Sequence, residues 1–168
     1  MPVNREYKST VFTSLFSDTR ELLSLYNAIM GLNLPETTYI EIATLEDDLF
    51  KNRLNDIAFV VEDRIVVLVE HQSTVSENMP LRMLIYMARI YEKLVNFNSV
   101  YRKALLKIPK PNFIVLYNGL EPFPDEKILR LSDAYKDDSG NSRIFGGSME
   151  LEVRVLNINK GSNLEIIR

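Results

Sequence analysis

The stretch that most constrains the fold is NDIAFVVEDRIVVLVEHQ, residues 55–72. Two runs rich in β-branched and aromatic residues, 56–61 and 65–72, flank the charged triplet EDR, and this pattern predicts a β-hairpin. Successive residues of a strand point to opposite faces, and here both faces are apolar. A hairpin of this kind has to be covered on both sides, so we expect it at the centre of a sheet.

Helices and further strands are expected on both sides of this hairpin. Asp18 can cap a helix over residues 18–31, and Gly31 can end it in a left-handed conformation. Asn78 can cap a second, longer helix that runs to about Phe97. The other expected elements are a strand over 37–42, a buried strand over 113–117, a short helix near 125–131, a strand over 149–159 and a helix at 161–168.

The composition is that of one globular domain. Hydrophobic residues make up 46% and charged residues 26% of the 168 residues, and a chain of this length buries roughly 68–70% of its surface on folding. We therefore expect residues 1–168 to form a single α/β domain that lacks a C-terminal helical extension of a longer protein, because the last helix stops early. No signal peptide and no apolar run of about 18 residues is found, so we expect a cytoplasmic protein.

The composition also limits the chemistry. The chain has no cysteine and a single histidine, so a bound metal ion would have to use oxygen ligands. A net charge of −3 argues against a protein that coats nucleic acid without specificity. The charge is unevenly spread, however, because residues 82–110 carry seven basic side chains and one acidic one. A local basic surface is therefore expected.

Polar residues stand at the tips of the apolar hairpin. If its turn has three residues, 62–64, Asp56 lies directly opposite Glu70, and Gln72 shares the face of Glu70. Two opposed carboxylates repel each other unless a cation neutralises them or one takes a proton, and their oxygens suit Mg²⁺ or Mn²⁺. The alternative is that Asp56 and Glu70 are strand-end charges in solvent and that Gln72 is a loop residue.

The same residues carry a resemblance to a known family. An Asp, thirteen residues of hairpin and Glu-x-Gln are followed by NMPLRMLIYMARIYEKL and FIVLYNG. This arrangement resembles the Rpn family of bacterial recombination-promoting nucleases and transposase-like proteins, within the PD-(D/E)XK nuclease superfamily. The likeness runs from about Phe12 to the end and is most specific between Leu54 and Tyr117. It implies a restriction-endonuclease-like core, helix, three strands, helix, strand, whose mixed central sheet is flanked by helices.

The resemblance implies roles for individual residues. Asp56 and Glu70 take the places of the two acids that hold a metal ion, and Gln72 takes the place of the motif lysine. Two departures are visible: Asn55 stands where the motif has proline, and Gln72 lacks the positive charge that lysine offers a transition state. Glutamine is usual there in the family, but weakened activity is one expectation. Glu21 could add a further acid, and the alternative is a solvated helix residue.

A stripe of polar side chains follows the long helix at helical spacing. Its members are Arg82, Tyr86, Arg89 and Lys93. The stripe is either a cationic ridge beside the metal site that contacts DNA phosphates, or the one solvent-facing stripe of a largely buried helix. On the first interpretation Arg82 and Tyr86, nearest the hairpin, are the better candidates.

More basic residues follow that helix: Arg102, Lys103, Lys107 and Lys110. They could follow a phosphate backbone, with an affinity that falls as salt rises. A plain solvated face is the alternative.

Two functions are therefore expected from different classes. The first is an endodeoxyribonuclease dependent on Mg²⁺ or Mn²⁺ and linked, through the resemblance, to DNA recombination and transposition. In it Asp56 and Glu70 hold the ion and Gln72 orients a water molecule. The second is a DNA-binding or interaction module that keeps the nuclease fold while its chemistry is weak or lost. DNA is the expected partner, a membrane is not, and a homo-oligomer is compatible with both.

Overall fold

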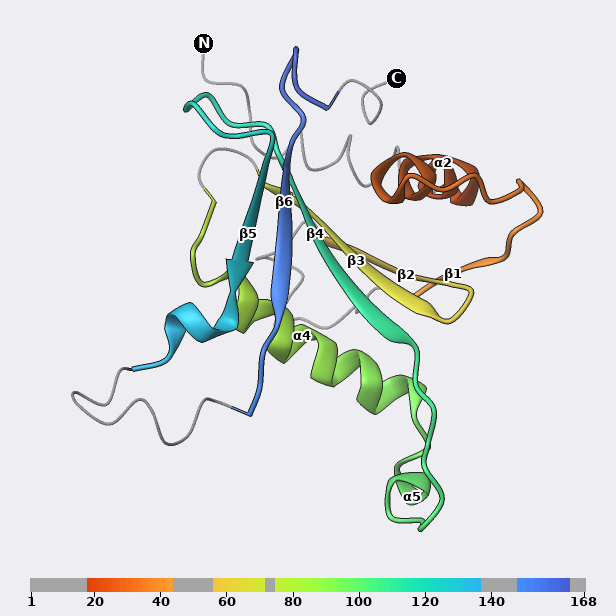
Figure 1. Ribbon diagram of the computed structural model, residues 1–168. Helices are drawn as coiled ribbons and strands as arrows, with labels where there is room; N and C mark the ends of the chain where they lie inside the picture. Colours follow the sequence, from red (N-terminus) through yellow and green to blue (C-terminus); the bar gives the residue numbers. More distant parts are fainter. Residues whose placement is uncertain (1–17, 44–55, 72–74, 137–147, 164–168) are drawn as a thin grey trace.

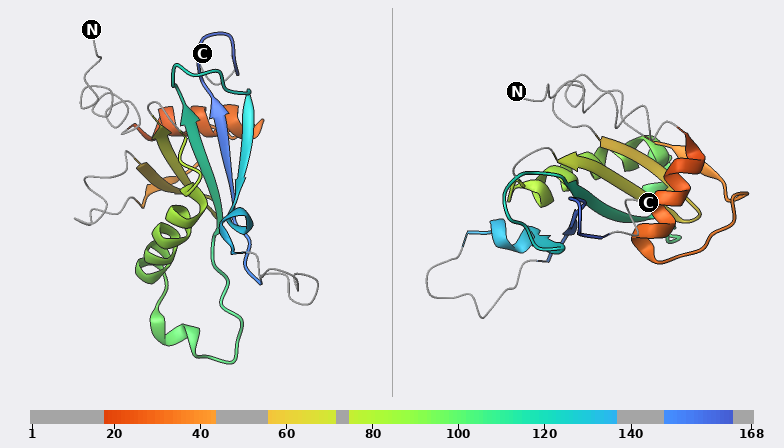
Figure 2. Two further views of the ribbon diagram at one scale, coloured as in Figure 1. Left: turned by 90° about the vertical axis from the view of Figure 1, so that its left-hand side faces the viewer. Right: turned by 90° about the horizontal axis from the view of Figure 1, so that it is seen from above.

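The computed structural model describes residues 18–43, 56–71, 75–136 and 148–163. These residues form one six-stranded mixed sheet with helices on its two faces (Figure 1, Figure 2). The expected α/β class, a mixed sheet flanked by helices, is confirmed. Among these residues no helix is long and apolar enough to cross a membrane.

Six strands make up the sheet. They are β1 (Ile40–Ile42), β2 (Asp56–Val61), β3 (Arg64–His71), β4 (Lys110–Tyr117), β5 (Glu126–Arg130) and β6 (Glu152–Asn157). In space they follow the order β1-β2-β3-β4-β6-β5. Neighbours are antiparallel from β1 to β3, then β3, β4 and β6 run parallel, and β5 is antiparallel to β6. The hairpin therefore lies inside the sheet, as its apolar faces predict.

Helix α2 (Thr19–Met30) covers one face of the sheet. The Asp18 carboxylate caps it by accepting from the backbone N–H of Arg20 at 2.9 Å, and Gly31 ends it with φ +61°. Its apolar side packs against the sheet, where the ring of Tyr26 meets Phe59 edge-on with centroids 6.2 Å apart. The helix expected over residues 18–31 is confirmed.

Helix α4 (Met79–Leu94) covers the opposite face. It leads from β3, through the single-turn α5 (Phe97–Val100), to β4, and so makes the long crossover that two parallel strands require. Pro80 stands in its first turn, while the Asn78 side chain makes no capping hydrogen bond. The helix ends at Leu94 rather than near Phe97, because Val95 turns the backbone to an extended conformation.

The hairpin turn differs from the expected one. The turn has two residues, Glu62 and Asp63, so Val61 pairs with Arg64 and not with Ile65. A positive φ of 51° at Glu62 permits this short turn, because the two-residue turns that match strand twist need a positive φ at their first position. The expected register is therefore wrong by one residue.

The segment expected to be a short helix near residues 125–131 is a strand. β5 pairs with β6 along its whole length, and a single turn of 3₁₀ helix, η1 (Leu131–Ala134), follows it. Ion pairs hold both ends of this ladder, Glu126 with Arg154 at 2.9 Å and Arg130 with Glu152 at 3.1 Å. Pairing with a strand distant in sequence outweighs the local preference.

Two apolar cores lie on the two sides of the sheet. Toward α4, side chains such as Ile65, Val67 and Val115 pack with Met83 and Tyr86. Toward α2 the neighbouring strand positions face the other way, and these include Phe59, Val66 and Ile114. The helix expected at residues 161–168 has its last five residues outside the described residues, and the first three are not helical.

Candidate metal edge of the sheet

The two acids of the motif lie at one edge of the sheet. Asp56 begins β2, and Glu70 is the last residue but one of β3. Because β2 runs antiparallel to β3, and β4 and β6 run parallel to it, this edge also holds the carboxyl ends of β4 and β6 (Figure 1). We call it the candidate edge. Carboxyl ends of parallel strands commonly form ligand sites in α/β sheets.

The register at the candidate edge corrects one expectation. Asp56 pairs with Val69, and Glu70 pairs with Leu116 on the other side of β3. Asp56 and Glu70 are therefore not directly opposite each other, as a three-residue turn would have placed them. Residues one position apart alternate between the faces of a regular sheet, so the register alone does not bring the two carboxylates together.

The structure describes the backbone of Asp56 and Glu70 but not their side chains, and Gln72 lies outside the described residues. Among the described side chains no group of three or more carboxylates or imidazoles could hold a metal ion. The metal ligands therefore stay a prediction. The donor set itself fits a hard cation, because two carboxylates and an amide supply only oxygen ligands to the ion.

A network of asparagine amides supports the candidate edge beside these acids. Asn157, at the end of β6, is 5% exposed, and its Nδ2 donates to the Phe123 carbonyl at 2.9 Å. Its Oδ1 accepts from the backbone N–H of Asn159, whose own Nδ2 donates to the Gly119 carbonyl at 2.9 Å. These bonds tie the chain after β6 to the loop after β4. That loop is therefore held against the sheet.

Gly119 and Tyr117 make this loop tight. The Tyr117 hydroxyl donates to the Glu121 carbonyl at 3.0 Å, and a Cβ at residue 119 would overlap the Tyr117 ring. The Asn118-Gly119 pair is typical of a turn, but the asparagine network was not predicted from the sequence. A polar Asn-x-Asn directly after the apolar run of β6 was the signal that could have indicated it.

The polar stripe of the long helix does not form one surface. Tyr86 is fully buried in the core beneath the sheet, Arg82 and Arg89 are half-buried, and Lys93 is exposed. The prediction of a single solvent-facing stripe is therefore wrong, and so is the prediction of a continuous cationic ridge. In this arrangement Tyr86 has no surface with which to contact a phosphate, whereas Arg82, in the first turn of α4, still has. Glu21 is exposed in the first turn of α2.

The later basic residues lie at the other edge of the sheet. Arg102, Lys103 and Lys107 belong to the segment before β4, and Lys110 pairs with Arg64 at the start of β3. β3 has eight residues, which separates the two edges by roughly 23 Å at about 3.3 Å per residue. These four cations therefore do not adjoin Asp56 and Glu70.

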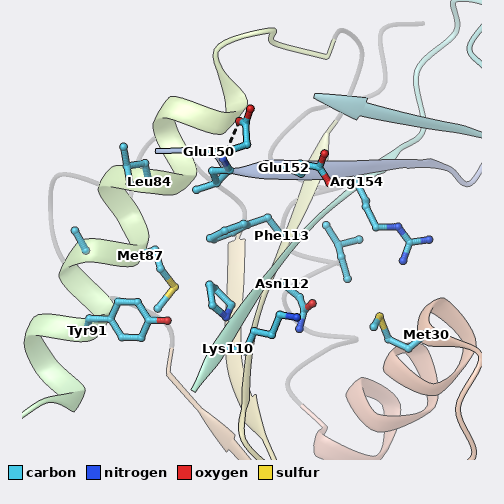
Figure 3. A pocket seen from close by; sticks show the side chains of 14 residues that line it. Met30, Leu84, Met87, Tyr91, Lys110, Asn112, Phe113, Glu150, Glu152 and Arg154 are labelled. Carbon is cyan, nitrogen blue, oxygen red and sulfur yellow. Dashed lines mark hydrogen bonds between the residues drawn. The ribbon is translucent and has the colours of Figure 1, made fainter. Parts of the chain in front are cut away.

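A hollow of about 660 Å³ also lies away from the candidate edge (Figure 3). Leu84, Met87 and Tyr91 of α4 form one wall, and the start of β4 and the segment leading into β6 form the other. The hollow is apolar with charged residues at its margin. Its place at the starts of β4 and β6 separates it from the predicted metal ligands.

Comparison with known proteins assigns the family. Residues 11–155 match the family described as "Putative transposase, YhgA-like". No curated protein and no solved structure matched the chain. The match covers more than half of the chain and includes the hairpin, both acids and the strands that carry them, so this protein belongs to the YhgA-like family of that description.

Proposed function

We propose that the chain is a metal-dependent endodeoxyribonuclease built on a PD-(D/E)XK-like core and that it acts in DNA recombination or transposition. One observation carries the proposal: in a member of the YhgA-like transposase family, Asp56 and Glu70 stand on neighbouring strands at one edge of the sheet. Apart from the single-turn α5, the element order α2, β1, β2, β3, α4, β4 is the order that the superfamily core implies, and this supports the proposal.

Each proposed role follows from the chemistry of the side chain. Asp56 and Glu70 would hold Mg²⁺ or Mn²⁺, and Gln72 would orient a water molecule through its amide. When bound, such an ion lowers the pKa of a coordinated water and polarises a phosphodiester. Arg82, the only cation in the first turn of α4, is the proposed phosphate contact, because a guanidinium can pair with two phosphate oxygens.

A second function is favoured by a specific observation. The register shift removes the direct opposition of Asp56 and Glu70, and Gln72 stands where active superfamily members have a lysine. A chain that binds DNA without cutting it would share both features. We therefore propose, as the alternative, a DNA-binding module with weak or no cleavage activity.

Cleavage of supercoiled plasmid separates the two functions. The protein is incubated with Mg²⁺ or Mn²⁺, with EDTA, and with the variants Asp56→Ala and Asp63→Ala. Asp63 is the matched control, because it is an exposed acid in the turn at the opposite end of the same hairpin. The nuclease requires metal-dependent nicking that Asp56→Ala abolishes and Asp63→Ala keeps.

Plasmid that stays intact with folded protein and either metal would contradict the nuclease. The binding module then requires that the protein shift the electrophoretic mobility of the plasmid in EDTA, and that Asp56→Ala leave this shift unchanged. Protein that neither cuts nor shifts DNA would contradict both functions.

A further inference from the structure

An arm with an exposed apolar surface projects from the body of the protein. It consists of α5 and residues 101–109, and it extends beyond the end of α4 (Figure 1, Figure 2). Three of its large side chains are mostly uncovered: Leu105 is 80% exposed, Tyr101 78% and Phe97 59%. Val100 and Ile108 are about half exposed as well. Folding of one copy of the chain thus leaves most of the apolar surface of the arm in water.

Hydrogen bonds hold the arm in this projecting position. At its end, the Tyr91 hydroxyl donates to the Pro109 carbonyl at 2.7 Å, and the backbone N–H of Lys110 donates to the Asp63 carbonyl at 2.8 Å. At its start, the Asn96 side chain caps α5 by accepting from the N–H of Asn98 at 3.0 Å. The end of the arm is therefore fixed to α4 and the sheet by polar contacts, and its start is a capped helical turn that follows α4 directly.

The apolar surface continues from the arm onto α4. Leu81, Ile85 and Ala88 are exposed and stand at helical spacing on the outer side of the helix. A hollow of about 550 Å³ lies between the last turns of α4 and the arm. It shares Ala88 and Tyr91 with the 660 Å³ hollow beside Leu84. The two hollows therefore form one continuous apolar face.

The charges on this face are complementary. The arm carries Arg102, Lys103 and Lys107 and no acid. Across the 660 Å³ hollow stands Glu150, and hydrogen bonds from Ser132 and from the backbone N–H of Leu151 lower the pKa of its carboxyl below the ordinary value. Glu150 is thus an anion, and among the described residues it forms no ion pair. The hollow is also lined by Lys110, and by Glu152 and Arg154, which pair with Arg130 and Glu126. Glu150 is therefore the acid of the hollow that the cationic arm of a second copy can neutralise.

The size of the face fits an interface. An aromatic side chain has about 150–250 Å² of surface, so Phe97 and Tyr101 alone expose on the order of 200–350 Å². With the exposed aliphatic side chains, the face exceeds the few hundred Å² that a monomer commonly exposes and approaches the ~800 Å² per partner of a standard interface.

We infer that this face joins two copies of the chain, with the arm of each copy lying in the 660 Å³ hollow beside Leu84 of the other. The occupant is a second copy because the arm carries both apolar side chains, which match the apolar lining of the hollow, and basic side chains, which match Glu150. A two-fold axis makes the contact twice, so the arrangement is closed and uses both arms. The inference concerns assembly and does not depend on the proposed function.

Sedimentation of the full chain over a range of concentrations tests the dimer. We expect a monomer–dimer equilibrium in which Leu105→Asp raises the dimer Kd about a hundredfold or more, since each dimer loses two buried leucines. Leu120→Asp is the matched control, because Leu120 is a fully exposed leucine in the loop after β4, outside the face. A wild-type protein that stays monomeric, or a Leu105→Asp dimer of unchanged Kd, would overturn the inference.

Mixing variants tests the exchange of arms. Leu84→Asp damages the hollow and Leu105→Asp damages the arm, so each variant alone should be monomeric. Their mixture keeps one intact arm and one intact hollow, and a heterodimer should form with one of the two contacts. If both variants fold, as judged by circular dichroism, and no heterodimer forms, the arm does not lie in the hollow.

Two milder substitutions keep the test informative if an aspartate variant fails to fold. Lys103→Glu with Lys107→Glu changes exposed side chains only, and should raise the dimer Kd about tenfold, with a larger effect at low salt. Glu150→Gln keeps an oxygen to accept the N–H groups of Ser132 and Leu151 but removes the charge, and should raise the Kd in the same direction. If neither the double lysine variant nor Glu150→Gln changes the dimer Kd, the charge complementarity is overturned.

Discussion

The two edges of the sheet carry different kinds of side chains. At the candidate edge, Asp56 and Glu70 stand at strand ends beside a network of asparagine amides, which holds the loop after β4 against the sheet. At the opposite edge an arm projects, with basic and apolar side chains that one copy of the chain leaves exposed. The contrast teaches that this fold keeps the acids of the candidate edge and the arm apart, because the strands between them span roughly 23 Å.

The largest expected effect tests whether the two edges are independent. If the proposed nuclease function holds, Asp56→Ala should lower the rate of metal-dependent plasmid nicking by about 10²–10³-fold or more, because the variant lacks a proposed metal ligand. The same variant should keep the sedimentation profile of the wild type, because residue 56 lies away from the arm. Loss of dimer together with loss of nicking would break the separation of the two edges.

Substitution of two tyrosines, one in the core and one on the arm, compares how much each region contributes to the free energy of unfolding. Tyr86→Ala empties a fully buried site under the sheet and should lower the free energy of unfolding by about 3–5 kcal/mol. Tyr101→Ala, on the arm, should change it by about 0.5 kcal/mol or less in the monomer. Urea unfolding at a concentration where the protein is monomeric measures both. A large loss for Tyr101→Ala would mean that the arm belongs to the core.

Two asparagines make the same comparison for hydrogen bonds. Asn157→Ala removes a buried amide, leaves the Phe123 carbonyl and the Asn159 N–H without their partner, and should lower the free energy of unfolding by about 1–3 kcal/mol. Asn96→Ala removes an exposed cap from the single turn of α5 and should cost about 0.5 kcal/mol. Thermal unfolding followed by circular dichroism checks both, and equal losses would contradict the tighter hold at the candidate edge.

The ion pairs at the two ends of the β5–β6 ladder give the smallest effect. The pKa of the Glu126 carboxyl lies below its ordinary value of 4.5, and the largest cause is the pair of hydrogen bonds from Arg154. Because the folded pKa is the lower one, the pair stabilises the protein above pH 4.5 and this contribution is lost as the pH falls through the folded pKa. Both side chains are partly exposed, so Glu126→Gln should cost less than about 1 kcal/mol at pH 7.

Comparison of unfolding at neutral and at acid pH checks this last prediction. The cost of Glu126→Gln should shrink as Glu126 becomes protonated in the wild type. Arg130→Met, which breaks the single hydrogen bond to Glu152 at the other end of the ladder, should cost less still. A cost for Glu126→Gln that grows toward acid pH would contradict the sign of the pKa shift.

Much of the fold could be predicted from local sequence. Asp18 and Gly31 stand at the two ends of α2, and Pro80 marks the first turn of α4. Runs of β-branched and apolar residues predicted β2, β3 and β4. Because both faces of the hairpin are apolar, they also predicted a central hairpin covered by other elements on both sides. These features follow from interactions within a few residues of each other, so the sequence alone determines them.

The register of the hairpin and the strand β5 needed the tertiary structure. A positive φ at Glu62 makes a two-residue turn where three residues also fit, and one residue changes the partner of Asp56. β5 has little strand preference of its own and is a strand because β6 offers it a ladder and two ion pairs. Both depend on partners that local propensity does not contain.

The placement of the charges shows the same division. The sequence determined that two acids follow the hairpin pattern, that any metal ion would have oxygen ligands, and that residues 82–110 are basic. Only the tertiary structure decided that Tyr86 is buried, that Arg102 and Lys103 lie at the edge opposite Asp56, and that the outer stripe of α4 is apolar. The physical reason is that a helix can turn any stripe toward the sheet, and the burial of the whole core, rather than the pattern of one segment, selects which stripe faces water.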